Sequence, residues 1–222
     1  MKQIAKILTG IYIIVVLLEL LFIFFRQDEL RWISKPLLMP LLMIIFYIGA
    51  KKKTGALFYL ILSALFLSWC GDILLQANLF IPGLVSFLLA HVCYIIYFKK
   101  AGTNKKGLLQ TKPLFMVPVL LYIIFLLVML FPFLGKLKIP VIVYSITIGV
   151  MLLMAINTRQ QVNYNASNFF ITGALLFVIS DSLLAINLFA MQHLVLSLGV
   201  MATYATAQFL IIKGALSINL MK

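Results

Sequence analysis

Two aspartates stand in matching sequence contexts and are the residues of this chain most suited to chemistry. Asp72 lies in Gly-Asp-Ile-Leu-Leu-Gln-Ala-Asn-Leu-Phe at 71–80, and Asp181 lies in Ser-Asp-Ser-Leu-Leu-Ala-Ile-Asn-Leu-Phe at 180–189. They are 109 residues apart, each stands near the end of a long apolar run, and the chain holds only five acidic residues. A carboxylate inside an apolar membrane segment costs about 3 kcal/mol on insertion scales and usually marks a functional position. Two of them in matched positions therefore indicate a functional pair.

Such a pair suits acid/base catalysis, in which one carboxyl group holds a proton while its partner stays ionised. Glycosidases use two carboxylates in this way to form an oxocarbenium-like species and to deliver water to it. A vinyl ether is hydrolysed by closely related chemistry. Protonation of its alkene carbon gives an oxocarbenium ion, which water attacks to form a hemiacetal that collapses to an aldehyde and an alcohol.

The composition places these carboxylates in a membrane. Of 222 residues, 64% are hydrophobic and 10% are charged, against about half and about a quarter in a soluble domain. Lipid must therefore surround most of the chain. Because backbone groups in hydrocarbon need internal partners, the apolar runs must be helices. We predict an all-α membrane protein, a single domain over 1–222, with eight transmembrane helices at about 4–25, 36–50, 55–76, 81–98, 113–133, 139–157, 167–190 and 193–213.

The charge distribution predicts the orientation of the chain. The net charge is +13, and thirteen of the eighteen Lys and Arg residues fall on the side of the membrane that holds both termini. By the positive-inside rule both termini are cytoplasmic, which predicts a multi-pass protein of the bacterial inner membrane. The cations lie in short loops, so they indicate orientation and attraction to anionic lipid rather than nucleic-acid binding. The first apolar run is predicted to be an uncleaved signal anchor.

The matched aspartates also predict an internal duplication. Four helices in each half is an even number, so both copies have the same orientation in the membrane. This arrangement is a parallel four-plus-four repeat, with the two copies at about 1–105 and 110–222. Cys70 and Cys93 lie within apolar segments and are interpreted as core residues, without a disulfide or a metal site.

Other polar side chains are predicted to lie near the aspartates. Lys35, with Ser34 beside it, stands directly before a predicted helix N-terminus, which is a natural anion site. Glu19 and His193 are predicted at a similar depth. Each of these residues has a structural alternative, such as a hydrogen bond between helices or a lysine reaching the membrane interface. Further candidates that could line the cavity or simply pack are His91, Tyr94, Tyr204 and Gln208.

Several kinds of site are absent from the sequence. There is no Gly-Xaa-Ser-Xaa-Gly nucleophile elbow and no His-Glu-Xaa-Xaa-His motif. There is also no Walker motif, and only two histidines exist, so we predict neither a multi-histidine metal site nor a cofactor.

The chain resembles the YhhN family of multi-pass membrane proteins in motifs that occur in the expected order. These motifs are Lys35-Pro36, Ser68-Trp69-Cys70-Gly71-Asp72, Gly83, Ser86-Phe87, Ala90-His91, Tyr94, residues 173–182 and Tyr204 with Gln208. Animal members of the family are lysoplasmalogenases, which cleave the vinyl ether of lysoplasmalogens to a fatty aldehyde and glycerophosphoethanolamine or glycerophosphocholine. The resemblance implies that the family's two aspartates correspond to Asp72 and Asp181.

The hypothesis from sequence is therefore a membrane hydrolase of lysoplasmalogen-type lysophospholipids. Asp72 and Asp181 form the acid/base pair, and Lys35 holds the phosphate. The residues predicted to orient water or substrate are His91, Tyr94, Tyr204 and Gln208. One alternative is a small proton-coupled transporter or lipid-binding protein. Another is a metal-dependent lipid hydrolase with Asp72, Asp181 and His91 as ligands.

Overall fold

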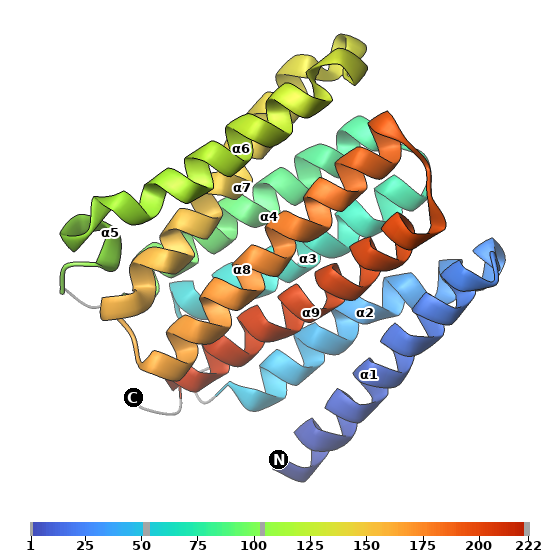
Figure 1. Cartoon of the computed structure of the whole chain (residues 1–222). Coiled ribbons are helices and arrows are strands. Elements are labelled where there is room, and N and C mark those ends of the chain that lie inside the picture. The colour runs from blue at the N-terminus through green and yellow to red at the C-terminus, as the bar shows by residue number, and fades with distance from the viewer. Residues whose placement is uncertain (1, 51–53, 103–104, 220–222) are drawn as a thin grey trace.

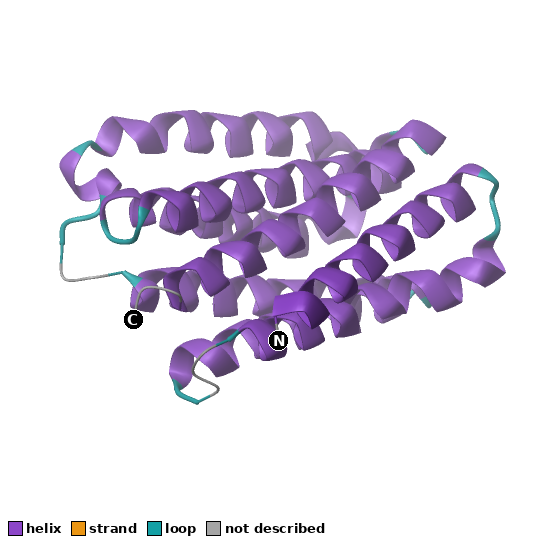
Figure 2. Cartoon of the chain, turned by 90° about the horizontal axis from the view of Figure 1, so that it is seen from below, coloured by secondary structure: helices purple, strands orange, loops and turns teal. Residues whose placement is uncertain are grey.

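The described part of the chain is an all-helical bundle. The computed structural model describes residues 2–50, 54–102 and 105–219, and within these ranges it contains helices and loops but no strand (Figures 1 and 2). Eight of the described helical segments are long and apolar enough to cross a membrane. The prediction of an all-α membrane protein with eight spanning helices is confirmed. Lys51, Lys52, Lys53 and Lys222, which contribute to the predicted charge bias, lie outside the described residues.

The helices follow one another through short connections. Their bounds are α1 Lys2–Phe24, α2 Asp28–Gly49, α3 Ala56–Gln76, α4 Phe80–Ala101, α5 Leu108–Thr111, α6 Val117–Leu130, α7 Lys138–Asn157, α8 Tyr164–Ala185 and α9 Leu194–Asn219. Short 3-10 turns flank α6, and a π-helical turn, Ile186–Ala190, continues α8. In Figure 1, α1 and α6 lie along opposite edges of the bundle. Both helices expose many apolar side chains.

The predicted start of the second helix at residue 36 is wrong, because α2 begins at Asp28. Asp28 and Glu29 occupy the first turn, where negative charge is favourable. Pro36 and Pro40 lie inside the helix, where a proline removes a backbone hydrogen bond. Pro40 cannot donate to the carbonyl of Pro36, but the indole N–H of Trp69 donates to that oxygen at 2.9 Å. A neighbouring helix thus satisfies the group that proline leaves free.

Two helix pairs pack closely through glycines. Gly173 of α8 lies against the backbone of α9 at Ala207, and Gly214 of α9 lies against Phe170 of α8. Between α3 and α4, Gly71 faces the ring of Phe87. A side chain at any of these glycines would clash, so the small residues allow the close approach that packing in lipid requires. Each of the helices that carry an aspartate, α3 and α8, is thereby packed closely against its neighbour.

These two pairs are also the corresponding pairs of the predicted duplication. The last residues of the matched segments, Phe80 and Phe189, meet edge to face with ring centroids 5.6 Å apart. The two segments therefore meet in space. The four-plus-four repeat itself stays a prediction.

Candidate active site

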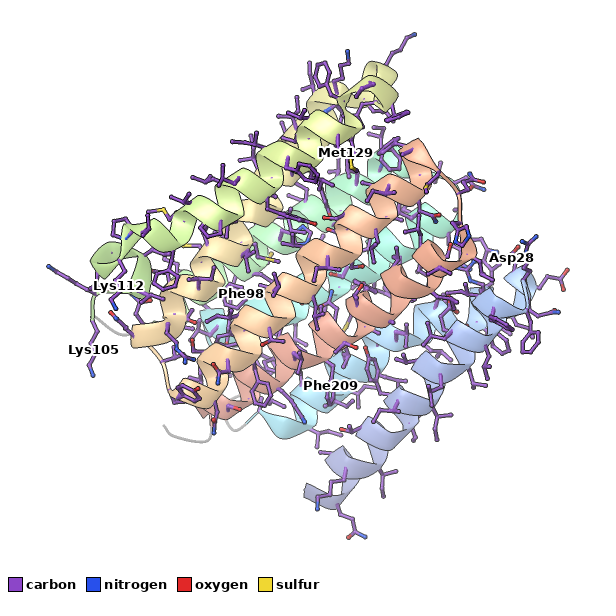
Figure 3. All side chains as sticks on the ribbon, viewed as in Figure 1. Asp28, Phe98, Lys105, Lys112, Met129 and Phe209 are labelled. Atoms are coloured by element: carbon purple, nitrogen blue, oxygen red, sulfur yellow. The ribbon has the colours of Figure 1, made fainter. Side chains whose placement is uncertain are left out.

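A cavity of about 570 Å³ lies between α2, α3, α4, α8 and α9 and brings the two aspartates together. The side chains of both Asp72 and Asp181 line it, each projecting from the C-terminal half of its helix. Asp28, also in the lining, lies at the end of the bundle where α2 begins (Figure 3). The cavity therefore opens near one end of the bundle, with the two carboxylates among its polar groups.

Asp72 is held by groups from two other helices. Its side chain is almost fully buried, and the hydroxyl of Tyr204 on α9 donates a hydrogen bond to Oδ2 at 2.7 Å. Nζ of Lys35 on α2 lies 3.7 Å from Oδ1. The rings of Phe87 and Phe177 pack edge to face against Tyr204, with centroids 5.9 Å and 5.5 Å away. These contacts fix the tyrosine, and the tyrosine orients the carboxylate.

Asp181 has a different set of neighbours. The hydroxyl of Tyr144 on α7 donates to its Oδ2 at 2.5 Å, and Nε2 of His91 lies 3.9 Å from the same oxygen. Among the described residues, no lysine or arginine forms an ion pair with Asp181. His91 is fully buried against the rings of Tyr144 and Phe177, and neither ring nitrogen has a hydrogen-bond partner in the described part of the chain.

Two of the residues predicted for the site lie behind it. The hydroxyl of Tyr94 donates to Oε1 of Gln208 at 2.5 Å, and Nε2 of Gln208 donates to Oγ of Ser68 at 3.0 Å. All three side chains are fully buried and none lines the cavity. They connect α3, α4 and α9 one turn away from Tyr204, so they support that tyrosine rather than touch the contents of the cavity. His91 is likewise outside the cavity lining.

The N-terminal half of α2 supplies two cations to the cavity, Arg31 and Lys35. The predicted helix N-terminus beside Lys35 is wrong, because Ser34 and Lys35 stand in the second turn of α2. Phosphate binding by Lys35 stays a prediction. Ser34 instead donates to Oε2 of Glu19 at 2.5 Å. Lys35 lines the cavity as a side-chain cation, without the help of free backbone N–H groups.

An apolar pocket of about 50 Å³ adjoins the cavity between α4, α6, α7 and α8. The two spaces share six lining residues, which are Leu75, Phe80, Phe87, Asp181, Leu184 and Leu188. Asp181 therefore stands at the junction of a polar and an apolar space. Asp72 lines only the polar cavity and not the apolar pocket.

Two site residues were missed by the sequence reasoning, Tyr144 and Arg31. Tyr144 could have been found through the repeat, because Lys35 and Asp72 are 37 residues apart and so are Tyr144 and Asp181. Arg31 was assigned to a loop, since Pro36 was interpreted as the start of the helix.

A metal site would need converging ligands. Within the described residues, no group of three or more His, Cys, Asp or Glu side chains is placed to hold a metal ion. The predicted alternative set of Asp72, Asp181 and His91 does not form such a group. Cys70 and Cys93 are free and half-buried, and are not linked in a disulfide.

The fold and the cavity define a polytopic helical membrane protein with an amphipathic site that carries two carboxylates. The YhhN family model matches residues 30–215, and the chain belongs to the YhhN family. The resemblance predicted from sequence motifs is confirmed.

Curated relatives of the chain have been named for an activity. A protein of Mycobacterium bovis named lysoplasmalogenase is 32% identical over 160 residues, which cover 68% of this chain and 58% of the relative. The chain thus spans less than two thirds of that relative's length. The rat protein named lysoplasmalogenase TMEM86B is 28% identical over 192 residues, covering 86% of this chain and 76% of the relative. The human protein of the same name is 29% identical over 196 residues, covering 86% and 78%. No solved structure matches the chain.

Proposed function

We propose that this protein is a membrane hydrolase of the lysoplasmalogenase type. It would cleave the vinyl ether of a lysoplasmalogen and release a fatty aldehyde and a glycerophospho-headgroup. The family membership and the names of the relatives support this activity. The observation that carries the proposal is that both carboxylates line one cavity, and that one of them also lines the adjoining apolar pocket.

The order of chemical groups in the site matches the order along such a lipid. A lysoplasmalogen carries a phosphate headgroup, then glycerol, then the vinyl ether, then a single hydrocarbon chain. The site presents Lys35, then the carboxylates, then the apolar pocket. With the phosphate near Lys35 and the first carbons of the hydrocarbon chain in the pocket, the vinyl ether lies beside Asp181, and the rest of the hydrocarbon chain extends into lipid. Before it binds, the hydrocarbon chain of the substrate already lies in lipid, which is as apolar as leucine. The pocket therefore positions the substrate more than it adds to the binding affinity.

The two carboxylates take different roles in this arrangement. The alkene carbon that must be protonated belongs to the hydrocarbon chain, and Asp181 is the carboxyl group at the pocket. We assign the proton donor to Asp181. Water reaches the oxocarbenium ion from the polar cavity, where Asp72 is the carboxylate. Its ion pair with Lys35 favours the charged form that a general base needs.

The reaction then proceeds in three steps, which are protonation, water addition and collapse of the hemiacetal. Asp181 gives its proton to the alkene carbon, and the ether oxygen shares its electrons to form the oxocarbenium ion. Water adds to the cationic carbon as Asp72 takes one of its protons, which yields a hemiacetal. Asp72 returns that proton to the leaving glycerol oxygen, and Asp181 recovers the hemiacetal hydroxyl proton. The products are an aldehyde and an alcohol, and both carboxyl groups regain their starting forms.

The surrounding side chains position these groups. Tyr204 and Tyr144 each donate one hydrogen bond to a carboxylate, which fixes its rotamer for proton transfer. His91 packs against Tyr144 and stands behind Asp181, while Tyr94 and Gln208 brace the helix that carries Tyr204.

The test is product formation by the purified protein in detergent. Mass spectrometry of a reaction with an alkenyl-glycerophosphocholine should detect both the aldehyde and glycerophosphocholine. In D₂O, the aldehyde should carry one deuterium at the carbon next to the carbonyl, since that carbon receives the proton. Asp72→Asn and Asp181→Asn should each abolish turnover without changing thermal stability by more than a few degrees.

Glu29→Gln is the matched control, because Glu29 is an exposed carboxylate outside the cavity lining. It should retain full activity. No aldehyde from the intact protein, or full turnover by either aspartate variant, would contradict the proposal. A proton current into sealed vesicles without aldehyde formation would instead support the transporter alternative, since transport needs two compartments and hydrolysis does not.

A further inference from the structure

A buried carboxylate on α1 has no part in the proposed reaction. Glu19 has no exposed surface, accepts a hydrogen bond from Ser34 at 2.5 Å, and accepts a second from Nε of Arg31 at 3.1 Å. A buried charge is costly unless it is paired and hydrogen-bonded. Glu19 therefore fixes one edge of the Arg31 guanidinium, and Arg31 is a wall of the cavity.

The other contact of Arg31 is of a different kind. One terminal nitrogen of its guanidinium lies 3.2 Å from Oδ1 of Asp28, whose side chain is 81% exposed. A guanidinium has five N–H donors in a planar fork, which suits phosphate oxygens. Arg31 thus has one fixed partner, Glu19, and one exchangeable partner at the cavity mouth, Asp28.

The four cavity-lining residues at the start of α2 form two pairs spaced by four residues. Asp28 and Trp32 make one pair, and Arg31 and Lys35 make the other, so each pair shares a helical face. Asp28 and Arg31 are separated along the helix axis by about 4.5 Å. Because the two side chains are neighbours on the helix, both can reach one phosphocholine or phosphoethanolamine group, in which a short linker joins the phosphate to the amine.

We infer that these residues are the headgroup subsite and determine which headgroup is accepted; the inference rests on the proposed function. The phosphate binds Arg31 and Lys35 and displaces Asp28 from the guanidinium. Asp28, now free, pairs with the cationic amine beside the ring of Trp32, which attracts cations through its face. Glu19 is a positioning residue, because it keeps Arg31 in place while Asp28 moves.

The charges at the subsite favour a zwitterionic headgroup over an anionic one. Arg31 and Lys35 contribute two positive charges, against the three carboxylates of Glu19, Asp28 and Asp72. A headgroup that carries only a negative charge adds to this excess of negative charge. A zwitterionic headgroup leaves the net charge of the subsite unchanged. It replaces the Asp28–Arg31 ion pair with two pairs, one between the phosphate and Arg31 and one between the amine and Asp28.

The experiment measures binding without hydrolysis. Native mass spectrometry would give the Kd of the full-length protein for lysophosphatidylcholine, which is zwitterionic, and for lysophosphatidylglycerol, which is anionic. Neither lipid has a vinyl ether. The wild type should bind the zwitterionic lipid more tightly. Asp28→Asn should reduce this preference about fivefold, the size expected for one partly exposed ion pair.

Glu29→Gln is the matched control, because it removes the neighbouring carboxylate of the same helical turn without touching the cavity. It should leave the preference unchanged. Arg31→Gln should weaken both lipids about tenfold or more, since a charged hydrogen bond to phosphate is lost from each. Arg31→Lys should restore little, because an ammonium lacks the fork.

Glu19→Gln tests the positioning role. It should raise the KM for an alkenyl-glycerophosphocholine while the KM for the matching alkenyl-glycerol, which lacks a phosphate, stays the same. If it unfolds the protein, the Glu19→Gln/Arg31→Gln double variant removes both charges and leaves no unpaired buried carboxylate. That variant should again lose affinity only for the phosphate-bearing lipid.

An unchanged headgroup preference in Asp28→Asn would overturn the inference, as would equal effects of Glu19→Gln on both substrates. Shifted binding without any aldehyde formation would leave the headgroup subsite standing and reject the proposed reaction. Aldehyde formation with no shift in binding would support the proposed reaction and reject the headgroup subsite.

Discussion

The two aspartates have matched partners of different charge. Each accepts a hydrogen bond from a tyrosine on another helix, and each contacts the residue 37 positions before it in the sequence. For Asp72 that residue is the cation Lys35, and for Asp181 it is the neutral donor Tyr144. Two similar scaffolds thus produce two inequivalent carboxylates, which is what a general acid and a general base require.

The two helices also end differently. After α3, Asn78 adopts a left-handed conformation with φ 61°, which asparagine tolerates better than most residues. After α8, a π-helical turn contains Asn187, whose side chain accepts from the backbone of His193 and donates to Ser197. Such π-helical turns are frequent at functional sites. The matched asparagines therefore serve different local structures, and of the two aspartates only Asp181 lines the apolar pocket.

Among the partners of the two aspartates, removal of the cation Lys35 should have the largest effect. Lys35→Met leaves Asp72 buried without a cation and also removes a phosphate contact, so kcat/KM should fall about 100-fold or more. Lys35→Arg should recover part of the loss because it restores the charge. Lys136→Gln, an exposed cation outside the cavity, is the control and should have no effect on turnover. Equal activity of Lys35→Met and wild type would show that Asp72 needs no cation.

Removing a tyrosine hydroxyl that donates to a carboxylate should lower activity less than removing Lys35. Tyr144→Phe deletes one hydrogen bond to Asp181, and Tyr204→Phe deletes one to Asp72. Each should lower kcat about tenfold with little change in KM. Tyr122→Phe is the control, since Tyr122 donates to Ser182 and not to a carboxylate. Kinetics of the three variants with one alkenyl-glycerophosphocholine would measure the difference, and a loss in Tyr122→Phe equal to the others would remove the distinction.

Filling the apolar pocket should change substrate choice rather than chemistry. Val141→Phe replaces a small aliphatic side chain in the pocket with a larger aromatic one, so kcat/KM for a long-chain substrate should fall about tenfold relative to a short-chain one. Val143→Phe, two residues away and exposed, should leave that ratio unchanged. An unchanged ratio in Val141→Phe would mean that the chain does not occupy this pocket.

The smallest effect is on stability alone. Trp69→Phe removes the hydrogen bond to the carbonyl of Pro36 and should lower the free energy of unfolding by about 1 kcal/mol. Thermal unfolding in detergent would show a slightly lower Tm. Trp32→Phe, which changes a half-exposed ring, should shift Tm less. Equal shifts in the two variants would indicate that the carbonyl of Pro36 has another adequate partner.

Hydropathy and composition were enough to predict the eight spanning helices, because lipid permits few other structures. They were not enough to place the start of α2, where Pro36 is a plausible first-turn residue and the compensating donor, Trp69, is distant in sequence. The cytoplasmic location of both termini and the internal duplication stay predictions.

The candidate site was predicted in part for a related reason. The aspartates can be predicted because charged residues are rare in this chain. Tyr204 and Lys35 are predicted to lie near the aspartates, and both contact Asp72. Tyr144 is one of nine tyrosines, and nothing local distinguishes it. Tyr94 and Gln208 were grouped with the cavity residues because helical spacing shows which side chains share a face, but not which neighbour that face meets.

The position of Asp181 between the polar cavity and a small apolar pocket has a consequence for the lipids of the membrane. A phospholipid with a second fatty chain would have to lay that chain among Asp72, Lys35 and Arg31, which line the polar part of the cavity. If the proposed reaction takes place here, two-chain phospholipids should therefore be poor substrates. The proposed hydrolase would then act on ether-linked lipids only after one of their two fatty chains has been removed.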